Sequence, residues 1–432
     1  MKAIARKVAD QLERIAARPG DAIFLRVDAD RAMAAAEASD ARIAAGRPLG
    51  PLDGVTVAVK GNLAVAGAPW TAGIAGWRGR IAERDATAVA RLRATGAIIL
   101  GEVNLHEGAL GATTDNPTFG RCANPLGAGL TPGGSSGGSG AAVAAGMADV
   151  ALGTDTMGSV RIPAAYCGVA GIKPTAGLVG RGGLAYLAPT LDSVGPLAPS
   201  VARLWPVLAA IAGPDVRDPD SLAAPAAWTE GQQPCDLSGL TFGVPRQIDD
   251  VDCEPAVLTA FALALEAARA AGAEIVTVDV AGWEPGRARR GGLLVSEAEG
   301  AVAMAALMDV EDAISAYLQG LLAYGRDAGA PRLVDAYARM RAAGAACHRA
   351  LATVDALILP TAPQRAFPHD TPAPANQADL TAIANFAGVP AVALPVPLAE
   401  GGLPGSVQLV GKPWSDGSLL AWAEHIEAEL AT

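Results

Sequence analysis

The sequence lacks several features that would assign it to other classes of protein. Although 51% of its 432 residues are hydrophobic, no apolar run reaches the roughly 18 residues that a membrane-spanning helix needs. The opening segment, MKAIARKVADQLERIAARPG, spreads charges through an amphipathic helical pattern and has neither the apolar centre nor the cleavage site of a secretory signal. We therefore expect a cytoplasmic protein that does not bind membranes.

Cysteine, aromatic residues and positive charge are also scarce. The five cysteines show no CxxC or Cys/His spacing, so we expect reduced structural thiols and no metal or organic cofactor. They are Cys122, Cys167, Cys235, Cys253 and Cys347. Lys and Arg number 33 against 44 Asp and Glu, which gives a net charge of -11. Such a field repels a phosphate backbone, so direct binding of nucleic acid is not expected.

The residues that are present alternate between strand and helix patterns. Residues 1–48 look helical, and GVTVAVK (54–60) is a β-branched apolar run typical of a strand buried on both faces, with Lys60 at its carboxyl end. A long connection rich in proline and aspartate follows at 214–239. Further strands are expected at 97–101, 240–245, 273–280, 355–363, 391–397 and 406–411, and helices at 85–95, 139–147, 254–271, 284–350 and 418–430. This alternation favours an α/β fold with helices on both faces of a sheet.

The stretch GGSSGGSG (133–140) holds three serines among glycines and admits several interpretations. It fits neither the P-loop pattern GxxxxGK[ST] nor the dinucleotide pattern GxGxxG, so a phosphate site is disfavoured. Residues 133–137 match the GxSxG elbow of α/β hydrolases, with His348, His369 and His425 downstream. That elbow requires a strand directly before the serine, and Leu130-Thr131-Pro132 is a poor one.

A second serine-bearing stretch, GTDTMGSVRIP (153–163), again places glycine beside a serine at a turn into a helix. A serine hydroxyl needs a base to become a nucleophile, and a lysine can serve if burial lowers its pKa. Lys60, at the end of an apolar strand, is such a lysine. Serine with lysine is a known variant of the catalytic triad.

These segments together resemble the amidase signature family. The resemblance is carried by GGSSGGSGAAVAAG and LGTDTMGSVRIPAAYCGVAGIKPT, and is reinforced by VAVKGN, TGAIILGEVN and NFAGVPAVALPVPLAEGGLPGSVQLVG. It is strongest from Lys60 to about Pro199 and extends more weakly over nearly the whole chain. The family is built on a large mixed β-sheet covered by helices, and no metal or organic cofactor takes part in its chemistry.

The resemblance implies a role for each catalytic residue. Ser159 would be the nucleophile, Ser135 the bridging serine and Lys60 the base. The family's cis peptide bond would here join Gly134 to Ser135. Backbone N–H groups would form the oxyanion hole, and the donors would be those of Thr156, Met157, Gly158 and Ser159.

Neighbouring residues are expected to support this site. Ser136 and Ser139 are expected to cap a helix N-terminus. Asp155 is expected to accept backbone hydrogen bonds, and Arg161 to pair with a carboxylate. Cys167 is expected in the core rather than as a thiol nucleophile.

Two positions depart from the family pattern. Met157 stands where glycine or another small residue is common, and its thioether would narrow or line the acyl pocket. Gly61 stands where aspartate is common, so one charge near the catalytic residues is missing.

We divide the chain into an N-terminal helical segment (1–50) that packs on the body, a core with the catalytic residues (51–213) and the remainder of the body (214–432). In the family, substrate choice is set by a variable region, here roughly 180–192 and 284–378. Arg287, Arg289 and Arg290 in this region either bind a substrate carboxylate or form a solvated helix face.

The expected reaction is hydrolysis of a small carboxamide or ureide-like substrate. GRGGLAYLAPTLDSVGPLAPSV and VQLVGKPWSDGSLL resemble bacterial members that act on nitrogen-rich urea derivatives, such as carboxybiuret hydrolase. The alternatives are a glutaminase subunit of a tRNA-dependent amidotransferase, an inactive binding scaffold and a classical α/β hydrolase. A homodimer or a small accessory subunit is a possible assembly.

Overall fold

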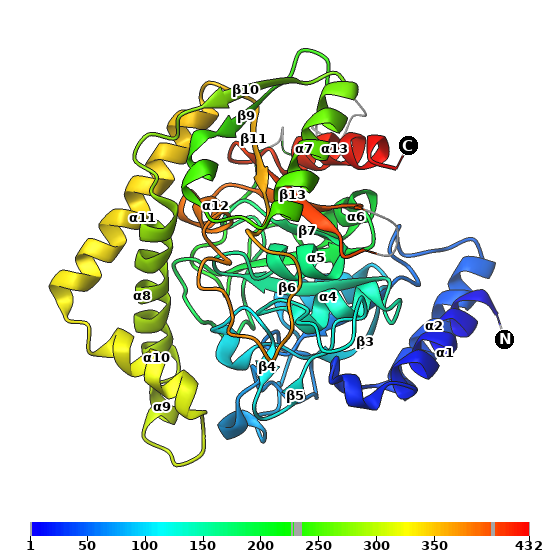
Figure 1. Cartoon of the computed structure of the whole chain (residues 1–432). Helices are drawn as coiled ribbons and strands as arrows, with labels where there is room; N and C mark the ends of the chain where they lie inside the picture. The colour runs from blue at the N-terminus through cyan, green and yellow to red at the C-terminus, as the bar shows by residue number, and fades with distance from the viewer. Residues whose placement is uncertain (1, 226–227, 229–235, 399–401, 432) are drawn as a thin grey trace.

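A single large sheet forms the centre of the protein (Figure 1). The computed structural model describes residues 2–225, 228, 236–398 and 402–431. Within them, 11 strands pair in the order β1-β3-β2-β6-β8-β7-β12-β13-β11-β9-β10. Pairs such as β2 with β6 are parallel, and pairs such as β12 with β13 are antiparallel. The predicted α/β fold with a mixed sheet is confirmed.

The strands of this sheet are β1 (Phe24–Val27), β2 (Thr56–Lys60), β3 (Ile98–Val103), β6 (Val150–Asp155), β7 (Ala170–Lys173), β8 (Ser193–Ala198), β9 (Thr241–Pro245), β10 (Glu274–Val278), β11 (Ala356–Pro360), β12 (Ala391–Val396) and β13 (Gly405–Gly411). A small separate sheet pairs β4 (Asp115–Asn116) with β5 (Gly120–Arg121). The helices are α1 (Ala3–Ala16), α2 (Ala29–Ala44), α3 (Thr87–Ala94), α4 (Gly137–Ala144), α5 (Arg161–Cys167), α6 (Leu204–Ile211), α7 (Pro255–Ala270), α8 (Pro285–Ala303), α9 (Ala305–Met308), α10 (Ala316–Arg326), α11 (Ala330–Leu351), α12 (Ala382–Phe386) and α13 (Asp416–Glu429).

Helices cover both faces of the sheet, and the alternation of side chains along each strand decides which residue meets which layer. Val57 and Val59 of β2 belong to a hydrophobic cluster that includes residues of α3, α6, α7 and α13. Ala58, between them, belongs to a second cluster with α1, α2, α4 and α5. Lys60, two residues after Ala58, therefore points to the side of α4 and α5.

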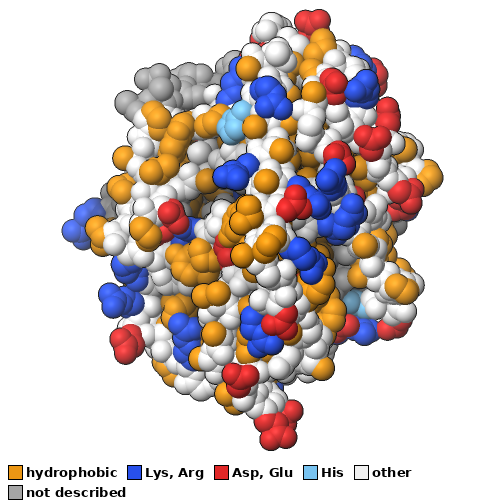
Figure 2. Space-filling view, turned by 90° about the vertical axis from the view of Figure 1, so that its left-hand side faces the viewer, with side chains coloured by type: hydrophobic (Ala, Val, Ile, Leu, Met, Phe, Trp, Pro, Cys, Tyr) orange, Lys and Arg blue, Asp and Glu red, His pale blue; other side chains and the backbone are white. Residues whose placement is uncertain are grey.

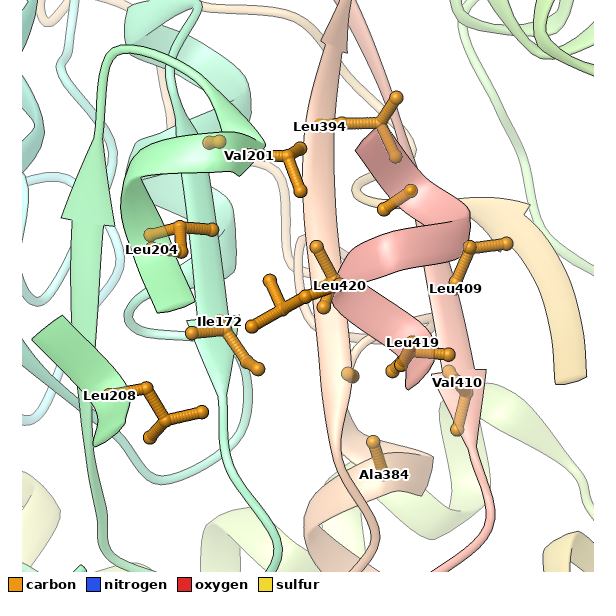
Figure 3. Close-up of a cluster of buried hydrophobic side chains, with 14 of the residues drawn as sticks. Ile172, Val201, Leu204, Leu208, Ala384, Leu394, Leu409, Val410, Leu419 and Leu420 are labelled. Carbon is orange, nitrogen blue, oxygen red and sulfur yellow. The ribbon is translucent and has the colours of Figure 1, made fainter. Parts of the chain in front are cut away.

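Apolar side chains from distant parts of the chain meet on the first of these faces (Figure 3). Ile172 of β7 and Leu204 of α6 lie on one side of the view, and Leu409 of β13 and Leu419 of α13 lie on the other. All of these side chains are fully buried. This packing joins the part before the 214–239 connection to the part after it, as does the antiparallel pairing of β7 with β12.

A group of long helices, α8, α10 and α11, stands on one side of the molecule (Figure 1). Helix α8 packs against both α10 and α11. A separate hydrophobic cluster lies beneath these helices and includes Val295 of α8, Leu322 of α10 and Met340 of α11. The expectation that 284–350 is helical is thus met by α8 to α11.

Other predictions need correction. Residues 1–48 are not wholly helical, because β1 lies between α1 and α2 and pairs antiparallel with β3 at the edge of the sheet. The segment 153–155, read as part of a loop, is the end of strand β6. Strands β7 and β8 were not predicted; their sequences, AGIK and SVGPLA, are short and contain glycine or proline, which weakens a strand signal.

The cysteines agree with structural roles. Cys122, Cys167, Cys253 and Cys347 are free thiols, and all but Cys253 are buried. Burial raises the pKa of the Cys167 thiol, which makes it a poor nucleophile. Cys235 lies outside the described residues. None of the described helices combines the length and the apolar composition that a bilayer-spanning segment requires.

Candidate active site

Lys60 occupies a fully buried position at the carboxyl end of β2. Its Nζ lies 2.8 Å from Oγ of Ser135, 2.9 Å from Oγ of Ser136 and 2.8 Å from Oγ1 of Thr154. Strand β6, which carries Thr154, is parallel to β2, so the two strands end at the same edge of the sheet. No side-chain carboxylate forms an ion pair with Lys60 among the described residues. Three hydroxyl groups therefore surround the amine.

The environment of Lys60 favours the neutral amine. Burial lowers its pKa to about 7, against the opposing attraction of Asp192 and Asp155. Because an ammonium ion loses its hydration when it is buried, the proton is held less tightly than in water. At neutral pH a substantial fraction of Lys60 is thus unprotonated and available as a base.

The structure corrects the prediction for Ser136 and Ser139. Ser136 stands at the N-cap position of α4, but its side chain makes no capping hydrogen bond. Its Oγ donates to the carbonyl of Thr154 at 3.1 Å and accepts from Lys60. Ser139 lies inside α4, and its Oγ donates to the carbonyl of Leu152 at 2.9 Å. Ser136 is therefore a direct partner of the buried amine, whereas Ser139 ties α4 to β6.

The glycine loop and the second serine loop meet at this point. The peptide bond between Gly134 and Ser135 is cis, and the backbone N–H of Ser136 donates to the carbonyl of Ser159 at 3.2 Å. The loop approaches other backbone closely, because a Cβ on Gly134 would lie 2.7 Å from the backbone of Ala112. Ser135 is fully buried, and Ser159 is half-buried and lines a cavity. The structure thus brings both predicted serines to one site.

The predicted oxyanion donors are not all free. The N–H of Gly158 donates to Oδ1 of Asp155 at 2.7 Å. This donor is therefore already engaged, and its predicted role does not fit the structure. The N–H groups of Thr156, Met157 and Ser159 donate to no other group in the described part of the chain. All three residues line the same cavity, so they are the donors that remain for an oxyanion.

Asp155 and Arg161 hold the second loop in place, as predicted. Asp155 accepts from the N–H groups of Gly158 and Val160, and it forms a fully buried ion pair with Arg161 at 3.0 Å. Burial by itself would raise the pKa of Asp155, but the charge and hydrogen bonds of Arg161, with the amide of Asn385, lower it to about 2. The carboxylate is thus ionised throughout the neutral range and acts as a fixed anchor.

The cavity that exposes Ser159 has a volume of about 360 Å³. Most of its lining is small or apolar, including Met157, as predicted from the sequence. The lining also includes Leu187 from the first part of the variable region and residues between 289 and 378 from the second. The lining residues from the second part are Arg289, Leu293, Ser296, Tyr317, Ala373, Pro374, Ala375, Gln377 and Ala378.

The three arginines of α8 differ in their surroundings. Arg289 lines the cavity, where it pairs with Asp379 at 2.5 Å, and only 14% of its side chain is exposed. Arg287 is exposed and pairs with Glu284. Arg290 is exposed and lies on an adjacent face of the helix, where it lines a different cavity. Only Arg289 is thus placed near Ser159.

Sequence reasoning missed His106, which lines the cavity. Its Nδ1 lies 3.3 Å from Oγ1 of Thr113, and its ring meets that of Tyr317 edge to face, with centroids 6.3 Å apart. Burial lowers the pKa of His106 to about 4, so the ring is neutral at neutral pH. A lone histidine between an apolar leucine and a glutamate gives no motif in the sequence that could have indicated this position.

The α/β-hydrolase interpretation of the sequence finds no support in the geometry. No strand precedes Ser135 directly, as the elbow of an α/β hydrolase requires. The histidines that such a triad would need, His348, His369 and His425, do not line the cavity. Within the described ranges, no group of three or more His, Cys, Asp and Glu side chains could hold a metal ion.

Comparison with known proteins relates nearly the whole chain to one group. The family model named Amidase matches residues 6–420. A glutamyl-tRNA(Gln) amidotransferase subunit from Synechococcus sp. (strain CC9311) is 38% identical over 94% of this chain and 89% of that protein. One similar solved structure is a chain of a vestigial protein complex that reveals the evolutionary origins of an s-triazine catabolic enzyme. It superposes with a TM-score of 0.90 at 31% sequence identity, and the match covers 99% of this chain and 95% of that one. Native peptide amidase from Stenotrophomonas maltophilia has a TM-score of 0.87 and 30% identity, and covers 100% of this chain and 94% of that one.

Proposed function

The chain belongs to the amidase family, whose members cleave amide C–N bonds, and on this premise we propose that it hydrolyses a small carboxamide or ureide-like substrate through an acyl-enzyme on Ser159. The observation that carries the mechanism is the 2.8 Å separation between Nζ of the buried Lys60 and Oγ of Ser135. It provides Ser135 with a base in a water-excluded position.

The hydrogen bonds around Lys60 support one direction for the relay. The hydroxyl of Ser136 donates to the carbonyl of Thr154, so Ser136 must accept an N–H from Lys60. Oγ1 of Thr154 also receives an N–H from the amine. A neutral amine has two N–H groups and one lone pair. Oγ1 of Thr154 accepts from the side-chain amide of Asn62 as well. When Ser136 and Thr154 accept the two N–H groups, the lone pair faces the hydroxyl of Ser135, which then gives its proton to Lys60.

The chemical steps follow from this relay. Oγ of Ser159 attacks the substrate carbonyl carbon while its proton passes to Ser135, and the proton of Ser135 passes to Lys60. The N–H groups of Thr156, Met157 and Ser159 stabilise the oxyanion that forms. Lys60 then returns the proton through Ser135 to the leaving nitrogen, which departs as ammonia or an amine. Water, deprotonated by the same relay, hydrolyses the ester on Ser159.

The shape and lining of the cavity support a small substrate. Its volume of about 360 Å³ and its small apolar walls suit a compact acyl group. Arg289 and Gln377 are polar groups on the wall that are placed to bind a polar substituent. The structural likeness to a chain connected with s-triazine catabolism agrees with a nitrogen-rich substrate.

A fluorophosphonate tests the assignment of the nucleophile. The purified enzyme should gain one adduct by intact mass, and peptide mapping should place it on Ser159. Lys60→Ala should slow labelling by about 10² to 10⁴, whereas Lys412→Ala, which changes an exposed lysine, should not. Release of ammonia from small amides, ureides and glutamine would then identify the substrate. An adduct on Ser135 or on another serine would contradict the assigned roles.

A second candidate is a glutaminase subunit that works with partner chains. It is favoured by the 38% identity to a subunit of a glutamyl-tRNA(Gln) amidotransferase over 94% of this chain. Ammonia release from glutamine that depends on an added partner would support it, and hydrolysis of small amides by the chain alone would contradict it. For either candidate we propose a cytoplasmic location and a homodimer or a small accessory subunit.

A further inference from the structure

A second cavity lies next to the active-site cavity, on an adjacent face of α8. It has a volume of about 420 Å³ and is formed by residues of α8, α10 and α11. Leu293 of α8 lines both this cavity and the one that exposes Ser159. The two spaces are thus separated by little more than one helix. We call the second one the α8–α11 cavity.

Glu297 is a buried carboxylate in the wall of this cavity, with 3% of the residue exposed. Its carboxylate makes no hydrogen bond or ion pair with a described residue, and its oxygens are open to the cavity. Burial raises its pKa to about 7, which the charge of Arg332 opposes. A mostly buried carboxyl group that faces a cavity and has no protein partner is suited to a ligand that brings a hydrogen-bond donor.

Arginines surround the same cavity. Arg290 of α8 has no hydrogen-bond acceptor among the described residues, and Arg332 of α11 donates only to the hydroxyl of Tyr324, at 2.6 Å. Arg339 pairs with Asp335, but its Nε is buried and has no acceptor. Figure 2 shows that Lys and Arg side chains gather near the middle of the face on which these helices lie. The rim of the cavity therefore offers several unused N–H donors to an anion.

The carboxylate of Glu297 and the guanidinium groups around the cavity do not pair with each other. Glu297 and Arg332 line one cavity and attract each other, yet they form no ion pair within 4.0 Å. A molecule that donates N–H groups to Glu297 and offers a carboxylate to the arginines would give both kinds of group a hydrogen-bond partner. We propose that the α8–α11 cavity is a second ligand site, which binds a small molecule that carries both a carboxylate and an ammonium or amide N–H group, such as an amino acid.

The spacing of residues on α8 links this site to the active site. Arg289, Leu293 and Ser296 line the active-site cavity at helical intervals. Arg290, Leu294 and Glu297 follow each of them by one residue and line the α8–α11 cavity. Because residues three and four apart share a face of a helix, these are adjacent faces of one rigid element. A ligand at the second site thus contacts the helix that also shapes the substrate cavity.

Isothermal titration calorimetry on the intact enzyme tests the proposal. The probes are glycine, L-alanine and L-glutamate, compared with acetate, which has only the carboxylate, and methylammonium, which has only the donor. At least one amino acid should bind about tenfold or more tightly than either half-molecule, because it satisfies both groups at once. Equal binding of acetate and the amino acids would overturn the proposal.

Variants locate the ligand. Arg332→Gln and Glu297→Gln should each weaken amino-acid binding about tenfold or more, and neither residue lines the active-site cavity. Arg326→Gln and Glu311→Gln, which change exposed residues outside the site, should leave binding unchanged. Arg332 is exposed, so its variant decides the question even if Glu297→Gln does not fold. If Arg332→Gln binds the amino acid as tightly as the wild type, the ligand lies elsewhere and the proposal is wrong. The same holds if binding is lost only when Ser159 carries the fluorophosphonate label.

Discussion

Oγ of Ser136 lies 2.9 Å from Nζ of Lys60 and donates its own proton to the carbonyl of Thr154, 3.1 Å away. Ser136 therefore accepts from the amine in both of its protonation states. The bond is stronger to the ammonium ion than to the neutral amine. Ser136 thus supports the charged form that Lys60 would take up in the proposed relay.

Ser136→Ala should lower kcat/KM by about 10- to 100-fold, because loss of a hydrogen bond to a charged group costs about 1.5–3 kcal/mol. It should also shift the rising part of the pH–kcat/KM profile to lower pH, since the ammonium ion loses an acceptor. Ser139→Ala is the matched control in the same helix, because Ser139 bonds to Leu152 and not to Lys60. Equal pH profiles for the two variants would show that Ser136 has no effect on the amine.

The pKa of about 7 for Lys60 predicts the pH dependence of the reaction. Only the neutral amine accepts a proton, so kcat/KM should rise about tenfold per pH unit below that pKa and level off above it. The measurement is kcat/KM from pH 5 to 9 with one amide substrate. A profile that keeps rising to pH 9 would mean that the amine is charged at neutral pH.

The same burial predicts a change in stability with pH. The folded pKa of about 7 lies below the ordinary value of 10.5, so between these values the unfolded chain binds a proton that the folded chain does not. Stability from this group therefore rises with pH across that window. Lys60→Met removes the titration, so its stability relative to the wild type should fall as pH rises from 7 to 10. Urea denaturation at several pH values measures this difference.

The buried pair of Asp155 and Arg161 predicts a large loss of stability when one member is removed. Arg161→Gln should lower the free energy of unfolding by about 3–5 kcal/mol, since Asp155 would keep its charge in a buried place. Arg93→Gln breaks a partly exposed pair with Asp85 and should cost less than about 1 kcal/mol. Urea unfolding of both variants gives the comparison, and similar losses would contradict the proposed anchor.

Met157 should limit the size of the acyl group. Its Sδ lies 2.7 Å from the place that a Cβ on Gly292 would take, so α8 holds the thioether against the cavity. Met157→Ala should raise kcat/KM for a substrate with a longer acyl chain by about 10- to 200-fold relative to a small one. The pH profile should stay unchanged, because Met157 does not touch Lys60. A uniform loss for all substrates would instead indicate damage to the oxyanion donors.

The sequence predicted which residues come together at the site better than it predicted the strands and hydrogen bonds around them. The apolar run before Lys60 correctly predicted a strand buried on both faces, because its pattern is uninterrupted. Strand β8 was missed because Gly195 and Pro196 interrupt it, although the pairing with β6 and β7 buries it. Local propensity cannot include such pairing, since the partners are distant in the sequence.

The errors within the site have the same origin. Ser136 was predicted to cap a helix because serine before a helix usually does so. The partner that draws its hydroxyl away is Lys60, which lies in another strand. The engagement of the Gly158 N–H by Asp155 likewise depends on how the loop folds. His106 has no motif and reaches the cavity only through tertiary structure.

Arg161 connects the parts of the chain before and after the 214–239 connection. Its guanidinium donates to the carbonyl of Thr381, to Oε1 of Gln408 and to Oδ1 of Asn385, all of which follow the 214–239 connection. The fragment that carries Lys60 and both serines keeps the pair of Asp155 and Arg161 but lacks these three acceptors of the Arg161 guanidinium. Two fragments cut within that connection should be inactive apart and recover activity on mixing, which would make this enzyme a reporter of fragment complementation.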